Sequence, residues 1–233
     1  KITPDDATDK TVTWSSDHPS VATVDAAGKV TAVGAGQATI TVQTHDGSFK
    51  AECRVTVVIS ITSIKLDQTA ITLIKDSSAA LMATITPLDT TEDKTVSWTS
   101  SNPNAATVDA AGRVTAVEGG TATITAAVGK HKAICSVTVL VPAAGISLDR
   151  PTITLVRGAQ DTLIAAIAPT DATDKAVAWS SNHPDIVTVD AKGDLKAIAQ
   201  GSATITAKSH DGGFTASCMV TVIVPVSGVT LDR

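Results

Sequence analysis

The chain has 233 residues, of which 43% are hydrophobic, 18% are charged and only 2% are aromatic. This apolar content is too high for a disordered chain, and no stretch reaches the roughly 18 apolar residues that would span a bilayer. The net charge of -5 argues against nucleic acid or an anionic membrane surface as a partner.

Three residue types recur along the chain with one spacing. The tryptophans are 84 and 81 residues apart, the cysteines are 82 and 83 apart, and a glycine lies 14 residues after each tryptophan. A fixed period of about 82 residues indicates tandem repeats. The nine marker residues are Trp14, Trp98 and Trp179, Cys53, Cys135 and Cys218, and Gly28, Gly112 and Gly193.

The period divides the chain into four parts. Residues 1–60 are a repeat truncated at its N-terminus, because residues 2–4 match residues 85–87 of the next repeat. Residues 61–142 and 143–226 are two complete repeats, and residues 227–233 match the first strand of a following repeat. We therefore predict a linear array in which neighbouring repeats are the first partners of each domain.

Within the repeat 61–142, apolar and polar residues alternate with period two between turn residues, which predicts short β-strands. Their number predicts a β-sandwich rather than a propeller, whose blades need only about 40–45 residues. In chain order the predicted strands are residues 64–66, 71–74, 79–86, 95–100, 106–108, 113–117, 121–128 and 132–141.

The tryptophans and cysteines share strand faces with valines, as Trp98 does with Val96 and Cys135 with Val137. We predict that they form the structural core: Trp14, Trp98, Trp179, Cys53, Cys135 and Cys218. A buried thiol behaves as a small hydrophobic group. One cysteine in each repeat leaves no second metal ligand nearby.

The marker glycines each end an Asp-Ala-Ala-Gly or Asp-Ala-Lys-Gly sequence between two strands. Gly28, Gly112 and Gly193 are therefore predicted to take positive φ in a turn. Phe49 and Phe214 lie four residues before a cysteine and are predicted to cap the core. That would leave no aromatic platform for a sugar ligand.

Neither a metal site nor a catalytic centre stands out. The loop before each Trp strand contains two or three acidic residues. Calcium is coordinated by six to eight oxygen ligands. We favour a solvated turn over calcium at a domain junction and predict no cofactor. The recurring Ser15 and Ser16 directly follow a predicted core residue and have no glycine-flanked turn around them. We therefore predict that the chain is not an enzyme.

Four motifs of the first repeat recur in the second: residues 12–16 (VTWSS), 21–25 (VATVD), 28–33 (GKVTAV) and 36–41 (GQATIT). Together they resemble the bacterial immunoglobulin-like group 2 (Big2) domain. The resemblance implies tandem immunoglobulin-like β-sandwiches. It also implies the kinds of protein that carry them: intimin- and invasin-like adhesins, extracellular enzymes and phage virion proteins. It implies no fixed activity.

These observations predict a structural stalk of an extracellular or bacterial cell-surface protein, which presents an adhesive or enzymatic tip. One alternative is an adhesion module whose loops contact a host protein or glycan. Another is a decoration or fibre domain of a phage virion. Neither membrane insertion nor nucleic-acid binding is expected of this segment.

Overall fold

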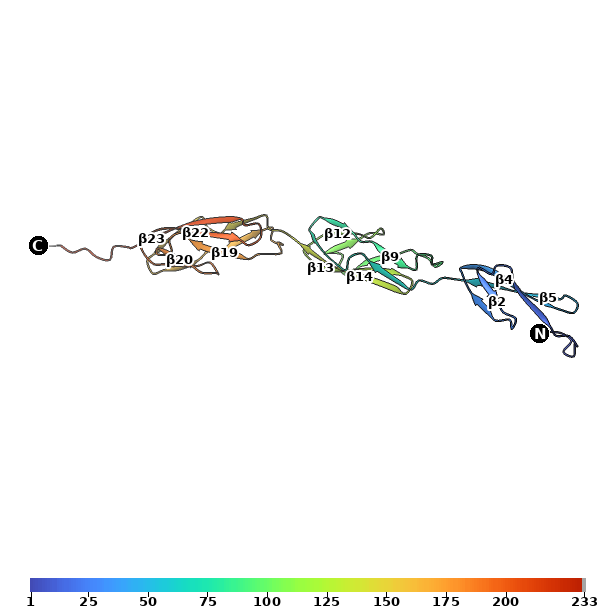
Figure 1. Ribbon diagram of the computed structural model, residues 1–233. Helices are drawn as coiled ribbons and strands as arrows, with labels where there is room; N and C mark the ends of the chain where they lie inside the picture. Colours follow the sequence, from blue (N-terminus) through green and yellow to red (C-terminus); the bar gives the residue numbers. More distant parts are fainter. Residues whose placement is uncertain (232–233) are drawn as a thin grey trace. The chain divides into compact units, whose positions relative to one another are not determined.

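The structure is a computed structural model that describes residues 1–231. In this range the chain forms 23 β-strands, and no helix is long and apolar enough to cross a membrane (Figure 1). The first repeat holds β1 (Val12–Ser16), β2 (Ala22–Val24), β3 (Val30–Ala32), β4 (Gly36–Thr44) and β5 (Lys50–Val57).

The second repeat holds β6 (Ser63–Leu66), β7 (Ala70–Ile74), β8 (Ser78–Ala80), β9 (Ala83–Thr86), β10 (Ser97–Ser100), β11 (Ala106–Val108), β12 (Arg113–Ala116), β13 (Gly120–Val128) and β14 (His131–Leu140). The third holds β15 (Gly145–Leu148), β16 (Thr152–Val156), β17 (Gln160–Thr162), β18 (Ala165–Ala168), β19 (Val177–Ser181), β20 (Val187–Val189), β21 (Asp194–Ala197), β22 (Gly201–Ser209) and β23 (Thr215–Ile223).

The Cα atoms group into two compact units, and the division runs through the second repeat. The first unit comprises residues 1–69, 81–99 and 125–135. The second comprises residues 70–80 and 100–124 and the chain from residue 136 onward.

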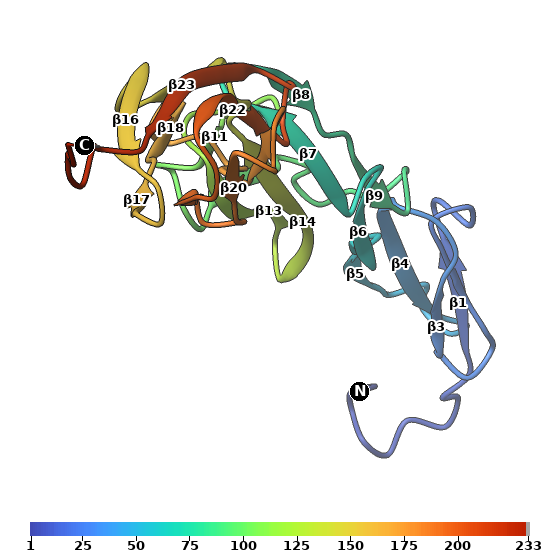
Figure 2. The same ribbon diagram turned by 90° about the vertical axis from the view of Figure 1, so that its left-hand side faces the viewer.

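The first unit contains the whole of the first repeat. Its sheets are β1-β4-β5 and the pair β2-β3, and β1 and β4 run side by side (Figure 2). Both pairings in the larger sheet are antiparallel, with Trp14 opposite Val42 and Ile40 opposite Cys53. The unit also contains the antiparallel pair β6-β9 of the second repeat.

The second unit contains the third repeat, which has a four-stranded sheet β16-β23-β22-β19 and a three-stranded sheet β17-β21-β20. Residues of both sheets pack into one core, with Ile205 and Val220 from the first and Leu195 from the second. The corresponding sheets of the second repeat have the orders β10-β13-β14-β7 and β11-β12-β8. Two sheets packed over a common core confirm the predicted all-β sandwich.

The apolar residues whose period-two spacing predicted the strands are the residues that face the core. Along β13, Ala122, Ile124 and Ala126 are buried while the residues between them are not. β-Branched threonines occupy many of the outward positions, where they fit a pleated surface. The outer strand of each complete sheet, β7 or β16, pairs in parallel with the last strand of its repeat.

The predicted strand 79–86 is wrong as one element, because the chain changes sheets in the middle of it. β8 pairs with β12 while β9 pairs with β6, and Leu81 between them is 2% exposed. The third repeat makes the same change at Leu163, which is 1% exposed. Period-two alternation continues across the bend, so the sequence pattern alone gives no sign of it.

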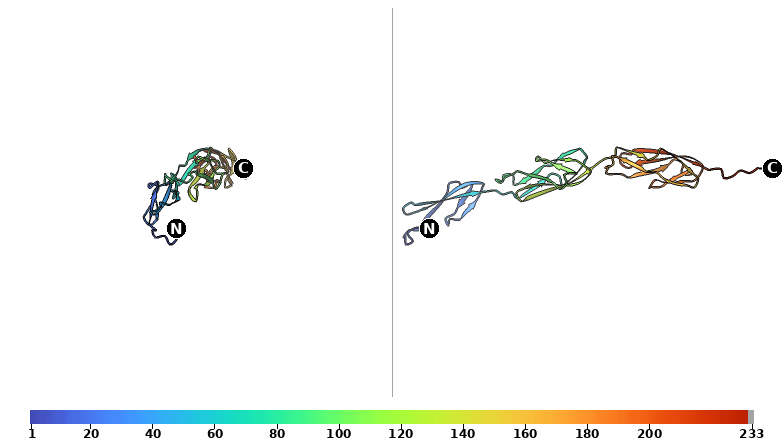
Figure 3. Two further views of the ribbon diagram at one scale, coloured as in Figure 1. Left: turned by 90° about the vertical axis from the view of Figure 1, so that its right-hand side faces the viewer. Right: turned by 180° about the vertical axis from the view of Figure 1, so that it is seen from behind.

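The predicted first strand of a following repeat, residues 227–233, is not formed in its described part, and residues 232 and 233 lie outside the described range. Residues 224–231 contain no strand (Figure 3). The equivalent strands β6 and β15 are paired with β9 and β18, and no such partner follows β23 among the described residues. A single strand without a partner leaves its backbone groups to water.

Candidate functional site

In the first and third repeats the tryptophan packs against the turn that joins the next two strands, β2 and β3 or β20 and β21. Gly28, Gly112 and Gly193 have φ of 83°, 82° and 89°, which only glycine adopts readily. A Cβ on Gly28 would lie 2.7 Å from the Trp14 ring, and one on Gly193 would lie 2.9 Å from Trp179 and 2.5 Å from the Leu163 carbonyl oxygen. A side chain is therefore excluded there for two separate reasons.

An aspartate fixes the backbone of the same turn. In the first repeat, Asp25 Oδ1 accepts hydrogen bonds from the backbone N–H groups of Ala27 and Lys29, both at 2.9 Å. Asp109 and Asp190 make the same pair of contacts in the later repeats. The tryptophans are half-buried, and each packs against the core cluster of its own repeat: Trp14, Trp98 and Trp179.

The cysteines differ between repeats. Cys135 and Cys218 are fully buried, and burial raises the pKa of both thiols. Cys53 is exposed, so the prediction of a core position is wrong for this residue. The reason is its strand: β14 and β23 are each flanked by a parallel strand, whereas β5 is the last strand of the order β1-β4-β5.

The phenylalanines do not cap the core. The Phe49 side chain is 76% exposed and that of Phe214 is 36% exposed, so this prediction is wrong. Their rings lie over the hairpin glycines instead: a Cβ on Gly47 would be 2.6 Å from Phe49, and one on Gly212 would contact Phe214. The hairpin between the last two strands therefore carries an accessible ring, which is most exposed in the first repeat.

Two histidines next to these hairpins are paired with aspartates. His45 Nδ1 lies 2.9 Å from Asp9 Oδ2, and His210 Nδ1 lies 2.5 Å from Asp174 Oδ2. Each pair ties the loop before the Trp strand to the hairpin. The Asp174 carboxylate raises the pKa of His210. Across residues 1–231 no group of three or more His, Cys, Asp or Glu is placed to hold a metal ion.

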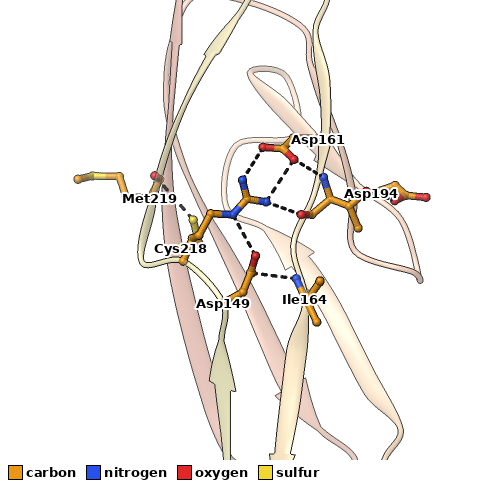
Figure 4. A network of polar contacts seen from close by, with 8 residues as sticks. Asp149, Asp161, Ile164, Asp194, Cys218 and Met219 are labelled. Carbon is orange, nitrogen blue, oxygen red and sulfur yellow. Dashed lines mark hydrogen bonds and ion pairs between the residues drawn. The ribbon is translucent and has the colours of Figure 1, made fainter.

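Of the two complete repeats, only the third carries an arginine shortly after its first strand, and the sequence reasoning did not find its contacts. The network around Asp149 and Asp161 is shown in Figure 4. Arg150 Nε donates to Asp149 Oδ2 at 3.0 Å, and its Nη1 and Nη2 donate to the two carboxylate oxygens of Asp161 at 2.9 and 3.2 Å. The guanidinium lowers the pKa of Asp161. Asp149 Oδ1 also accepts from Ile164 N–H at 2.9 Å, so the network fastens β15 to its neighbours. The second repeat has Gln68 and Ala79 at the matching positions.

The segment that leads into each complete repeat is hydrogen-bonded to that repeat. In the third repeat, Thr173 N–H donates to the Val141 carbonyl at 2.8 Å, and Val141 N–H donates to Thr173 Oγ1 at 2.7 Å. Ala143 N–H donates to Asp211 Oδ2 at 2.7 Å. In the second repeat, Ile59 exchanges the same pair of bonds with Thr91. These linkers are therefore held and not free.

The chain enters and leaves the third repeat at opposite ends of its larger sheet. It enters beside the hairpin between β22 and β23, where Asp211 binds Ala143. It leaves at Val222, which pairs with Gly201 at the start of β22. β22 has nine residues, so these ends are about 30 Å apart at about 3.3 Å per residue.

Two-sheet sandwiches that follow one another along the chain define the protein as a tandem array of immunoglobulin-like domains. The model of the bacterial Ig-like domain (group 2) matches residues 1–55, 60–137 and 142–220. The chain belongs to this family, as its motifs predicted.

Similar proteins from several sources carry related segments. An uncharacterized protein of Clostridium acetobutylicum is 38% identical over 165 residues, which are 69% of this chain and 17% of that protein. An α-L-arabinofuranosidase of Bifidobacterium longum is 61% identical over 56 residues, 24% of this chain and 5% of the enzyme. An Ig-like virion protein of Serratia phage KSP90 is 39% identical over 84 residues, 36% of this chain and 33% of that protein.

The chain thus spans a third or less of the length of each of these relatives. Family membership together with the virion relative makes the chain a structural or adhesion-type module. Its location is extracellular, at a cell surface, or in a virion, as predicted.

Proposed function

We propose that the chain is a non-catalytic spacer that separates an anchored part of a longer protein from an adhesive or enzymatic part. The observation that carries this proposal is the position of the two ends of the third repeat, on opposite sides of a sheet about 30 Å long. A repeat threaded in this way adds length between whatever precedes it and whatever follows.

The linkers support the same role. Val141 and Ala143 are hydrogen-bonded to the repeat that follows them, and Pro142 between them fixes φ. A linker restrained at both flanking residues resists bending more than a Gly/Ser linker does. The Bifidobacterium relative carries a short related segment in an α-L-arabinofuranosidase, which fits a portable module better than a module with chemistry of its own.

The proposal is tested by a length series on a surface. The chain is fixed at one end, a reporter is attached to the other, and reporter height is measured by neutron reflectometry before and after residues 61–142 are duplicated. A spacer gains about 40 Å for the added repeat, from its strand length plus loops. The control is a flexible Gly/Ser chain of 233 residues that is lengthened by as many residues as the duplicated repeat. Its end-to-end distance gains only about 14 Å, because this distance grows as the square root of the number of residues. An increment equal to that of the control would contradict the proposal.

One observation favours a second role, contact with a host protein or glycan. The Phe49 ring is 76% exposed at the tip of a hairpin, where aromatic side chains supply much of the contact energy of interfaces. Phe49→Ser should then abolish retention on a host-cell surface without changing the thermal unfolding of the chain. Unchanged retention would contradict this second role.

A further inference from the structure

The first part of the third repeat changes sheets at residues 149–151. Before this segment, β15 forms an antiparallel pair with β18. After it, β16 pairs in parallel with β23 in the four-stranded sheet. The segment therefore joins two separate strand pairings. A load that enters the repeat along β15 reaches β16 only through these three residues.

The first and last residues of this segment are hydrogen-bonded to neighbouring strands. Asp149 N–H donates to the Ile164 carbonyl at 3.0 Å, and Asp149 Oδ1 accepts from Ile164 N–H at 2.9 Å. Met219 N–H donates to the Pro151 carbonyl at 2.9 Å. Ile164 directly precedes β18, and Met219 lies in β23. The backbone on both sides of Arg150 is therefore fixed.

Arg150 ties the middle of the segment to β17 in the other sheet. Its guanidinium donates to both carboxylate oxygens of Asp161 and to the Thr162 carbonyl. A two-point contact between arginine and a carboxylate fixes orientation as well as distance. The side chains of Arg150 and Asp161 are 39% and 31% exposed, so water and salt screen this pair less than they screen a fully exposed one.

The direction of a load on the third repeat follows from where the chain enters and leaves it. The chain enters beside the β22–β23 hairpin, where Asp211 binds Ala143, and it leaves after β23 at the other end of the larger sheet. Tension therefore draws β15 and β16 backward along their own axes relative to β18 and β23. The paired strands are sheared, so the hydrogen bonds of a pair carry the load together. Once β15 has left β18, the contacts of Arg150 must break before the load passes to β16.

The second repeat has the aspartate part of this arrangement without the arginine. Asp67 Oδ1 accepts from Met82 N–H at 2.8 Å, as the equivalent aspartate does in the third repeat. Gln68 occupies the position of the arginine, and Ala79 occupies the position of its carboxylate partner. Because alanine offers no carboxylate, the two-point contact belongs to the third repeat and not to the second.

We propose that Arg150, bound to Asp161 and Asp149, is a mechanical lock that delays the unfolding of the third repeat under tension. The lock keeps the load on β15 from reaching the β16–β23 pairing until the guanidinium has separated from β17. The inference rests on the proposed spacer for its biological setting, because a spacer between an anchored part and a tip carries tension along the chain.

Force-clamp spectroscopy on the full chain tests the lock. Handles are attached at the exposed residues Ala144 and Ser227, so that the load passes through the third repeat, and the dwell time before unfolding is measured at constant force. Arg150→Gln should shorten the dwell time about three- to tenfold, because forced unfolding follows the unfolding rate and a charge-assisted contact is lost. Arg157→Gln removes an exposed arginine of the same repeat. It is the matched control and should change the dwell time by less than about twofold.

A second pulling direction separates a lock from a general loss of stability. With the handles at Lys192 and Thr215, both exposed, the load does not enter along β15, and Arg150→Gln should change the dwell time by less than about twofold. Glutamine stands at the matching position of the second repeat, so the fold accepts this residue there.

Two results would overturn the proposal. One is an unchanged dwell time of Arg150→Gln with the handles at Ala144 and Ser227. The other is an equal shortening in both pulling directions, which would show that the arginine only stabilises the repeat. The length gain that tests the spacer does not depend on Arg150, so a failed lock leaves the spacer proposal standing.

Discussion

Replacement of Gly193 by alanine tests whether the turn and the tryptophan form one rigid unit. The residue has φ of 89°, a conformation that costs an L-residue about 1–2 kcal/mol. Its new Cβ would also meet the Leu163 carbonyl oxygen at 2.5 Å and the Trp179 ring at 2.9 Å. The carbonyl belongs to the backbone and cannot move alone, so we expect a total cost of about 3–5 kcal/mol.

Gly158 supplies the matched control in the same repeat. Its φ is 88°, but a Cβ there would meet nothing within 4 Å. The second repeat even has a non-glycine residue at the corresponding position, since Asp76 adopts φ of 67°. Gly158→Ala should therefore cost only the backbone term, about 1–2 kcal/mol.

The assay is differential scanning calorimetry of the whole chain, in which only the transition of the third repeat should move. At about 4–8 °C per kcal/mol for a domain of this size, Gly158→Ala lowers its Tm by about 5–15 °C and Gly193→Ala by about 15 °C or more. Equal shifts for the two variants would refute the reasoning, because they would show that the turn relaxes away from Trp179 and Leu163.

Four other outcomes follow from the site. The Thr39 N–H lowers the pKa of Asp17 from 3.8 to about 2. This carboxylate therefore stabilises the first repeat above pH 3.8, and the stabilisation is lost as pH falls to about 2. Asp17→Asn should reduce the pH dependence of stability in that window, measured as acid unfolding by circular dichroism. Asp174 raises the pKa of His210 above 6.5, so their pair stabilises the third repeat fully below pH 6.5 and less as pH rises through the raised pKa. Asp174→Asn should remove this pH dependence of stability, measured as unfolding followed by Trp179 fluorescence. Arg150→Gln should return the pKa of Asp161 toward 3.8 in an NMR titration, and an unchanged pKa would contradict the ion pair. A maleimide should label Cys53 alone in the native chain and reach Cys135 and Cys218 only after unfolding; three fast thiols would contradict the burial found here.

The period of the sequence was enough to predict the fold and the Trp–glycine turn. Trp14 and Gly28 have counterparts in Trp179 and Gly193 because the ring lies against the same tight turn in both repeats. Alternation predicted the inward residues of β13 and β14 for a related reason: one face of each strand must be buried for the sandwich to form.

Other features depend on what lies beside a residue in space, which the pattern along one strand does not report. Cys53 and Cys135 each have an alanine two residues before and a valine two residues after on the same strand face, but the strand of Cys53 has no parallel partner at the outer edge. Phe49 has the parity of a core residue, yet its ring lies over Gly47 in the hairpin. The Arg150 network joins side chains on separate strands, so its only sequence signal was a change of residue type between matching positions of the repeats.

The most direct test of the spacer proposal is the radius of gyration of the chain in solution by small-angle X-ray scattering. Repeats acting in series give a particle about 100 Å long or more, with a radius of gyration of about 30 Å, whereas a compact globule of 233 residues has about 17 Å. We predict the larger value, and a radius near 17 Å would contradict the account.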